Sequence, residues 1–252
     1  MKKRVCAAVL FLTGTAAAFA APAWLPEFGL SAGAGGILGG HFTRYRLQAD
    51  GNNMAINANQ NINQFEYGIF AFFDATFATI GIIFQGGASR FNEPARDGFG
   101  DPVSLPNLSE SGQGWEAVLG FSILGRFPFR LSDRFTVFPL LGMDYHISLM
   151  QRRTDEQGRV YSRDDGQEMY LGGAFSLSDW NAFFVRIGGG VEFDLTERFF
   201  LRGDLLYGIR LMTSYERKNL EFMEALSDDP SPTLGGLSSG PSVRFSVGWR
   251  LR

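Results

Sequence analysis

The sequence predicts an all-β protein, a closed antiparallel transmembrane β-barrel of about eight strands preceded by a cleaved signal peptide. Three observations support this fold class. Apolar and polar residues alternate with a period of two in segments of about ten residues, as they do in membrane strands. Short and long connections alternate between these segments. Beyond the leader, no apolar run reaches the roughly 18 residues of a spanning helix.

The N-terminus is typical of a secretory signal peptide. A basic start at Lys2 to Arg4 precedes an apolar stretch from Val5 to Leu12, and Ala18 to Ala20 has a small-x-small cleavage pattern. We therefore expect residues 1–20 to be removed and residues 21–252 to form one barrel domain with four long extracellular loops. Because Cys6 lies in the leader, the mature chain should have neither a disulfide nor a thiolate metal site.

The alternation is clearest in three strand pairs, each with large apolar side chains on one face and glycine, polar or charged residues on the other. The pairs are Phe65–Asp74 with Ile80–Ser89, Trp115–Ile123 with Phe135–Leu149, and Phe183–Asp194 with Phe199–Leu211. A last strand, Ser242–Leu251, can close on a glycine-rich first strand from about Phe28 to Tyr45. Closure removes sheet edges whose unpaired backbone groups would be costly in lipid.

The predicted connections fall into two length classes, which would occupy opposite rims of the barrel. Short turns are expected near residues 75, 131 and 196. Long polar loops are expected at Arg46–Gln64, Phe91–Gly114, Arg152–Ser178 and Thr213–Gly240. Within these loops, Leu220–Leu226 could form a short amphipathic helix, and a hairpin at Glu168–Leu177 would raise the number of strands to ten.

Aromatic residues gather near the expected strand ends, where they would form two girdles at the membrane interfaces. The predicted girdle residues are Phe65, Tyr67, Trp115, Phe135, Tyr145, Trp180, Phe193, Phe199, Tyr207 and Trp249.

With the turn and strand at Leu195–Asp204, the chain resembles the small eight-stranded outer-membrane barrels, which include the OmpA transmembrane domain, OmpX and the OmpW family. The resemblance covers nearly the whole mature chain. It implies location in the bacterial outer membrane, with outer-membrane lipid and the barrel-assembly machinery as partners. Family members usually end in an aromatic residue, whereas this chain ends Trp249-Arg250-Leu251-Arg252. Recognition by that machinery would then be weaker or would use Trp249.

Charged residues recur in mid-strand on the face opposite the large apolar residues, which would be the lumen. Their signs nearly balance, so we expect them to pair with one another and fill a narrow barrel. A ring of one sign would instead indicate ion selectivity. The predicted lumen charge network comprises Glu66, Asp74, Glu116, Asp144, Arg186, Glu192, Arg202, Asp204, Arg210, Arg244 and Arg250.

His41, His146 and Ser148 form a candidate polar site in the lumen. With Asp144 they have the residue types of a nucleophile, a base and an acid, as in lipid-modifying outer-membrane enzymes. Three alternate residues of one strand span about 13 Å, however, so this strand alone cannot assemble a triad. We expect lumen hydrogen bonding, and we assign no catalytic residue, metal or cofactor.

Glycine-rich segments, including Gly33 to Gly40 and Gly188-Gly189-Gly190, lie within strand patterns and open no helix. They therefore do not resemble phosphate-binding loops. We expect them to permit the tight curvature of a small barrel.

The favoured hypothesis is a non-enzymatic barrel whose surface loops contact a host or surface ligand. A channel for small or hydrophobic solutes is the alternative that the OmpW resemblance implies, with inward Ile83, Phe138, Leu140 and Phe184 in support. A lipid-modifying enzyme is the third. Net charge of −3 without a basic cluster excludes nucleic acid as an expected partner. The sequence leaves open whether the lumen conducts, which ligand binds and what the oligomeric state is.

A soluble lipocalin-like barrel is the main rival fold, because alternation alone does not say which face points inward. Repeated mid-strand charges opposite a continuous aromatic and aliphatic face favour lipid on the outside.

Overall fold

The computed structural model describes residues 29–50, 55–92, 96–97, 112–155, 160–162, 181–211 and 233–251. The expected signal peptide, the helix at 220–226, the extra hairpin at 168–177 and Trp180 lie outside the described residues. Within the described part, no helix has the length and hydrophobicity needed to cross a membrane.

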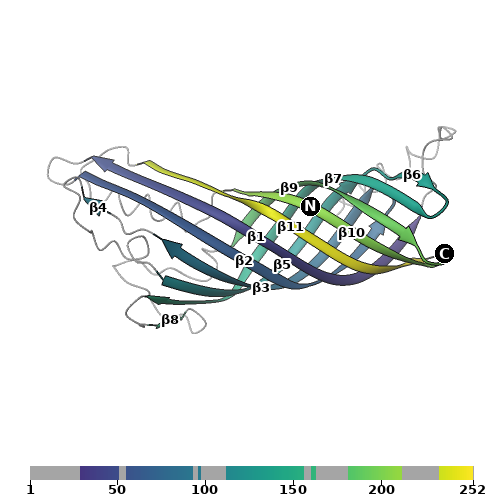
Figure 1. The fold of residues 1–252 in the computed structure, drawn as a ribbon, viewed down its shortest axis with the longest axis horizontal. Helices are drawn as coiled ribbons and strands as arrows, with labels where there is room; N and C mark the ends of the chain where they lie inside the picture. The colour runs from purple at the N-terminus through teal and green to yellow at the C-terminus, as the bar shows by residue number, and fades with distance from the viewer. Residues whose placement is uncertain are drawn as a thin grey trace, which may run out of the picture.

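Eight strands of the described chain form a closed antiparallel ring (Figure 1). They are β1 (Leu30–Asp50), β2 (Ala55–Ala75), β3 (Ala78–Asn92), β5 (Gly112–Arg126), β7 (Phe135–Asp155), β9 (Ala182–Asp194), β10 (Phe199–Arg210) and β11 (Thr233–Leu251). Each pairs with the next in this series, and pairing of β1 with both β2 and β11 closes the ring. The short strands β4 (Arg96–Asp97), β6 (Phe129–Ser132) and β8 (Val160–Ser162) pair with β2, β7 and β7. The prediction of a closed barrel of about eight strands is confirmed.

The strand register determines the width of the barrel. Starting at Phe42 on β1, the paired residues are Ser239, Ile209, Val185, Met143, Ile123, Ile80 and Phe73, and the path returns to β1 at Ala32. The ring therefore closes with a stagger of ten residues. For eight strands, this stagger gives a strand tilt of about 40° and an interior that side chains can fill.

The two faces of the sheet differ as the alternation predicts. Large apolar side chains point outward around the whole ring, including Ile69, Leu141 and Phe245, which are 65%, 61% and 63% exposed. Inward positions instead hold buried charges such as Asp144 and Arg186. A continuous apolar exterior of this size is unfavourable in water and favourable in lipid. The protein is therefore a transmembrane barrel of the outer-membrane type, not a lipocalin-like soluble barrel.

The long-loop rim differs from the sequence prediction. β1 continues to Asp50 and β2 begins at Ala55, so most of the expected Arg46–Gln64 loop is a strand hairpin. β11 likewise begins at Thr233, inside the expected 213–240 loop. Figure 1 shows β1 and β2 extending past the rest of the ring. Period two is lost in these segments because neither face of a sheet beyond the membrane has to be apolar.

Smaller differences concern the other connections. The expected turn near residue 131 contains β6, which pairs with the start of β7. β7 also runs to Asp155, into the third expected loop. The turns at Thr76-Phe77 and Leu195–Arg198 lie where the sequence predicts them.

The glycine run in β9 contains both a position without space for a side chain and a position with space. A Cβ on Gly188 would overlap the carbonyl oxygen of Leu205 and lie 2.9 Å from the Cα of Leu206, whereas one on Gly189 would meet nothing closer than 3.4 Å. We expect Gly188→Ala to lower the free energy of unfolding by about 1–3 kcal/mol, because the paired backbone must move. Gly189→Ala should change it by less than about 0.5 kcal/mol. Urea titrations of the two variants refolded into phospholipid vesicles would measure these changes. Equal unfolding midpoints would contradict the conclusion that Gly188 lacks space for a side chain whereas Gly189 has it.

Candidate functional site

The lumen is the candidate site, and it is packed with charged side chains in three layers. The layer nearest the short turns centres on Asp74 of β2, whose carboxylate accepts hydrogen bonds from Arg126 Nη1 at 2.7 Å and Arg202 Nη1 at 2.9 Å. Arg126 also lies 3.0 Å from Glu192, and Arg202 lies 2.9 Å from Asp204. Because β2 and β10 are three strands apart in the ring, this layer crosses the lumen.

A second layer centres on Asp144 of β7. Its Oδ2 accepts hydrogen bonds from Arg186 Nε at 2.8 Å and from Arg244 Nη2 at 3.0 Å. Arg244 Nη1 also donates to Ser122 Oγ at 3.5 Å, which joins β11 to β5 on the opposite side of the ring. The side chains of the three ionised residues are 0–2% exposed. In a site so deeply buried, charges persist because they are paired.

The third layer lies toward the long-loop rim and contains the first histidine of the candidate polar site. His41 Nδ1 lies 2.8 Å from Glu66 Oε1. Gln64 donates to Glu66 at 3.2 Å and also to Glu116, which in turn accepts a hydrogen bond from Gln151 at 3.4 Å. The Gln64 amide therefore links the two carboxylates of this layer.

Two buried apolar clusters share the lumen with these layers. They comprise Ile37, Phe70, Phe72, Ile83 and Phe200, and Leu124, Phe138, Leu140 and Leu206. The guanidinium of Arg202 lies 4.9 Å from the ring centroids of both Phe72 and Phe138, which joins the apolar and charged parts into one packed core. This packing includes Ile83, Phe138 and Leu140. These are three of the inward apolar residues that support the solute-channel alternative in the sequence analysis.

The structure places the remaining predicted lumen residues near the two rims. Arg250 lies close to the short turns, with Nη2 2.6 Å from Asp194 Oδ1, and Arg210 is half-buried near the long-loop end of β10. Arg126 was missed because the predicted strand stopped at Ile123, whereas β5 continues to Arg126 just before Phe127-Pro128. Extending the alternation of this strand by three residues, from Ile123 to Arg126, would have found it. The predicted charge network had one more carboxylate than arginine. The positive charge of Arg126 makes the two numbers equal.

The candidate polar site is buried but does not form a catalytic arrangement. His41 and His146 flank the ring of Phe184, at centroid distances of 4.8 and 4.7 Å. Ser148 Oγ and His146 Nε2 have no hydrogen-bond partner among the described residues, so no base contacts the serine hydroxyl. The described residues also contain no cluster of three or more potential metal ligands of the His, Cys, Asp and Glu types.

Of the predicted girdle residues, those within the described chain lie on the outer face. At the short-turn end, Phe199 stacks on Trp249 with ring centroids 6.3 Å apart. Toward the long-loop end, Phe65 and Tyr67 are 6.3 Å apart, and the Tyr207 hydroxyl lies 2.8 Å from Ser239 Oγ. Polar tips near a rim and apolar rings below it suit an interfacial position.

No protein-family model and no curated protein matches the sequence. The fold is similar to that of solved barrels at low TM-score. They include Ail, the attachment invasion locus protein of Yersinia pestis, in complex with the heparin analogue sucrose octasulfate (TM-score 0.29, 15% identity, 87% of this chain and 99% of that chain). Neisserial surface protein A matches with a TM-score of 0.28 and 12% identity, over 87% of this chain and 98% of that chain. The translocator domain of the autotransporter NalP from Neisseria meningitidis matches with a TM-score of 0.28 and 11% identity, over 98% of this chain and 95% of that chain.

Proposed function

We propose that the protein is an occluded, non-enzymatic outer-membrane barrel that acts at its extracellular end by contacting other surface or host molecules. The observation that carries this proposal is the pair of ion-pair layers across the lumen. The side chains of Asp74, Arg202, Asp144, Arg186 and Arg244 are at most 2% exposed. A lumen filled in this way supports a function outside the barrel.

The strand lengths favour the long-loop end as the place of contact. β1 and β2 have 21 residues each, whereas β9 and β10 have 13 and 12. A tilted strand needs about 9–11 residues to cross a membrane. The longer strands therefore support a paired sheet that projects beyond the bilayer on the side that is extracellular in outer-membrane barrels. Such a sheet would give connecting loops a rigid base for recognition.

A channel for small solutes is the second candidate, and one observation favours it. Both polar atoms of the Gln85 side chain, His146 Nε2 and Ser148 Oγ are buried without a hydrogen-bond partner in the described chain. Groups of this kind are usually satisfied by water or by a polar ligand. A polar path that enters the lumen from the long-loop rim would have to pass the Asp144 and Asp74 layers to reach the short-turn rim.

Single-channel recording in planar lipid bilayers tests occlusion. We expect no sustained conductance from the refolded wild-type barrel. A triple variant, Asp144→Ala with Arg186→Ala and Arg244→Ala, removes one whole layer but leaves the Asp74 layer across the lumen, so it should show at most brief openings of low conductance. Asp133→Asn, in an exposed turn, serves as the control and should resemble wild type. Steady conductance of the wild type would favour the channel.

The extracellular part of the proposal needs a separate test. Residues 47–58 can be replaced by an Asn-Gly turn, because Arg46 and Asn59 face each other in the register. The shortened barrel should keep its heat-modifiable migration, while bacteria that display it should lose adherence to cultured epithelial cells. Unchanged adherence would contradict a role for this hairpin. Phospholipid and lipid A turnover that disappears in both His146→Ala and Ser148→Ala would contradict a non-enzymatic function.

A further inference from the structure

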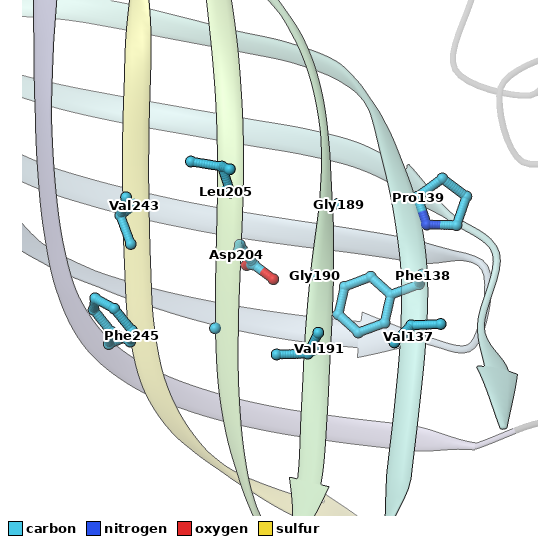
Figure 2. A pocket seen from close by; sticks show the side chains of 11 residues that line it. Val137, Phe138, Pro139, Gly189, Gly190, Val191, Asp204, Leu205, Val243 and Phe245 are labelled. Carbon is cyan, nitrogen blue, oxygen red and sulfur yellow. The ribbon is translucent and has the colours of Figure 1, made fainter. Parts of the chain in front are cut away.

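The lipid-facing surface contains an open apolar recess of about 560 Å³ that spans four neighbouring strands. Gly189 of β9 and Gly203 of β10 form its floor, while Pro139, Leu205 and Phe245 contribute to its walls. Figure 2 shows the lining side chains arranged across β7, β9, β10 and β11. Most outward positions elsewhere carry large side chains, so the two glycines create a local depression in the apolar band. The volume falls within the range of small-ligand sites.

The height of the recess places it in one leaflet. Gly203 is four residues from Phe199, the first residue of β10 at the short-turn rim. With a rise of about 3.4 Å per residue and a tilt of about 40°, the floor lies about 10 Å above that rim. The hydrocarbon layer is about 30 Å thick. Since short turns face the periplasm in outer-membrane barrels, the recess lies at the depth of acyl chains in the periplasmic leaflet.

Two exposed arginines lie at the rim below the recess. Arg134 precedes β7, and its carbonyl accepts a hydrogen bond from the Asp194 N–H of β9 at 2.9 Å. Arg198 precedes β10, and its carbonyl accepts one from the Arg250 N–H of β11 at 2.8 Å. Each arginine is thus anchored beside two of the four strands. Neither guanidinium forms an ion pair within the described chain.

The local charge also favours an anion. The exposed charged residues at this part of the rim are Arg130, Arg134 and Arg198, with Asp133 and Glu197, so arginine outnumbers carboxylate. A phosphate at the rim could accept hydrogen bonds from both guanidiniums, because the planar guanidinium group donates well to phosphate oxygens. An acyl chain descending from that phosphate would reach the depth of Gly203.

We propose that this recess and its arginine rim bind an anionic phospholipid of the periplasmic leaflet, with one acyl chain over Gly189 and Gly203 and the phosphate between Arg134 and Arg198. Charge complementarity selects this occupant over a second copy of the barrel, whose rim would bring the same arginines together. A phospholipid held at one position of the barrel circumference would orient the protein among its membrane neighbours.

The recess can be filled without disturbing the barrel. A Cβ on Gly203 would meet no atom closer than 3.8 Å, and the same holds for Gly36, an exposed outward glycine on β1. Gly203→Leu therefore blocks the proposed acyl site, and Gly36→Leu adds the same side chain elsewhere on the lipid face. Arg134→Gln with Arg198→Gln removes the phosphate contacts, and Arg44→Gln, exposed near the opposite rim, is their control.

Native mass spectrometry of the refolded barrel, released from micelles that contain equal amounts of phosphatidylglycerol and phosphatidylethanolamine, provides the measurement. We expect wild type, Gly36→Leu and Arg44→Gln to retain one phosphatidylglycerol in preference to phosphatidylethanolamine. Gly203→Leu should reduce retention about fivefold or more, equivalent to about 1 kcal/mol. The double arginine variant should retain lipid but lose the preference for the anionic headgroup. Heat-modifiable migration would verify folding of each variant.

Two results would overturn the proposal. One is retention by Gly203→Leu equal to that of Gly36→Leu, which would mean that lipid binds without the recess. The other is a dimer in place of a lipid adduct, abolished by Gly203→Leu, which would identify the recess as a contact between two barrels. Neither result depends on whether the lumen conducts.

Discussion

Asp144→Asn is expected to lower the free energy of unfolding by about 3–5 kcal/mol, because it leaves two buried cations without a counter-ion. Arg186 and Arg244 both donate to Asp144, and neither forms an ion pair with another described carboxylate. The asparagine keeps the size of the side chain and removes only its charge. Urea titrations of the barrel in phospholipid vesicles would show the loss as a lower unfolding midpoint.

Asp74→Asn is the matched comparison. It also removes the carboxylate to which two arginines donate, but Arg126 keeps Glu192 at 3.0 Å and Arg202 keeps Asp204 at 2.9 Å. We therefore expect a smaller loss than for Asp144→Asn. The structure indicates that the second layer depends on one carboxylate, that of Asp144. A lower stability of the Asp74 variant than of the Asp144 variant would contradict this.

The lumen residues could be predicted from the sequence, but their partners could not. The period-two pattern identifies Asp74 and Arg202 as inward because parity along each strand is fixed. Their contact depends on the stagger of ten residues around the ring, which sets the heights at which β2 and β10 face each other. Stagger is a property of the closed sheet, and no single strand carries a signal for it.

The rims were predicted less well than the membrane-spanning part, for a related physical reason. In lipid, one face of each strand has to be apolar, and this requirement writes the alternation into the sequence. The residues around Asp50 and Ala55 belong to a hairpin beyond that requirement, so their strands look like a polar loop. The lipid-facing recess had no signal at all, because Gly189 and Gly203 become neighbours of Pro139 and Phe245 only through pairing.

Inward glycines provide the last link between sequence and lumen packing. Gly248 pairs with Phe200, and a Cβ at Gly248 would overlap the Phe200 ring. Gly33 pairs with Phe72 and leaves space for its ring in the same way. Glycine on one strand therefore accommodates a large side chain on the next, and together these rings fill the short-turn end of the lumen.

Phe200→Ala should consequently cost about 3–5 kcal/mol of unfolding free energy. The Phe200 side chain is fully buried, lies 6.4 Å from Phe72 between ring centroids, and has the Arg250 guanidinium 5.1 Å from its own centroid. Its neighbour Phe199 points outward and is 48% exposed. Phe199→Ala should therefore cost about 1 kcal/mol, mainly from the lost contact with Trp249. Urea midpoints of both variants in vesicles compare the same truncation on the two faces of one strand.

If the two alanine variants lost equal stability, the lumen would contribute no more than the girdle, and the packed core would not explain the barrel's stability. A larger loss for Phe199→Ala would reverse the inward and outward faces of β10. The expected order, with Phe200→Ala the less stable, follows because an inward cavity is bounded by paired side chains that cannot collapse into it, whereas lipid chains adapt around a smaller residue at position 199.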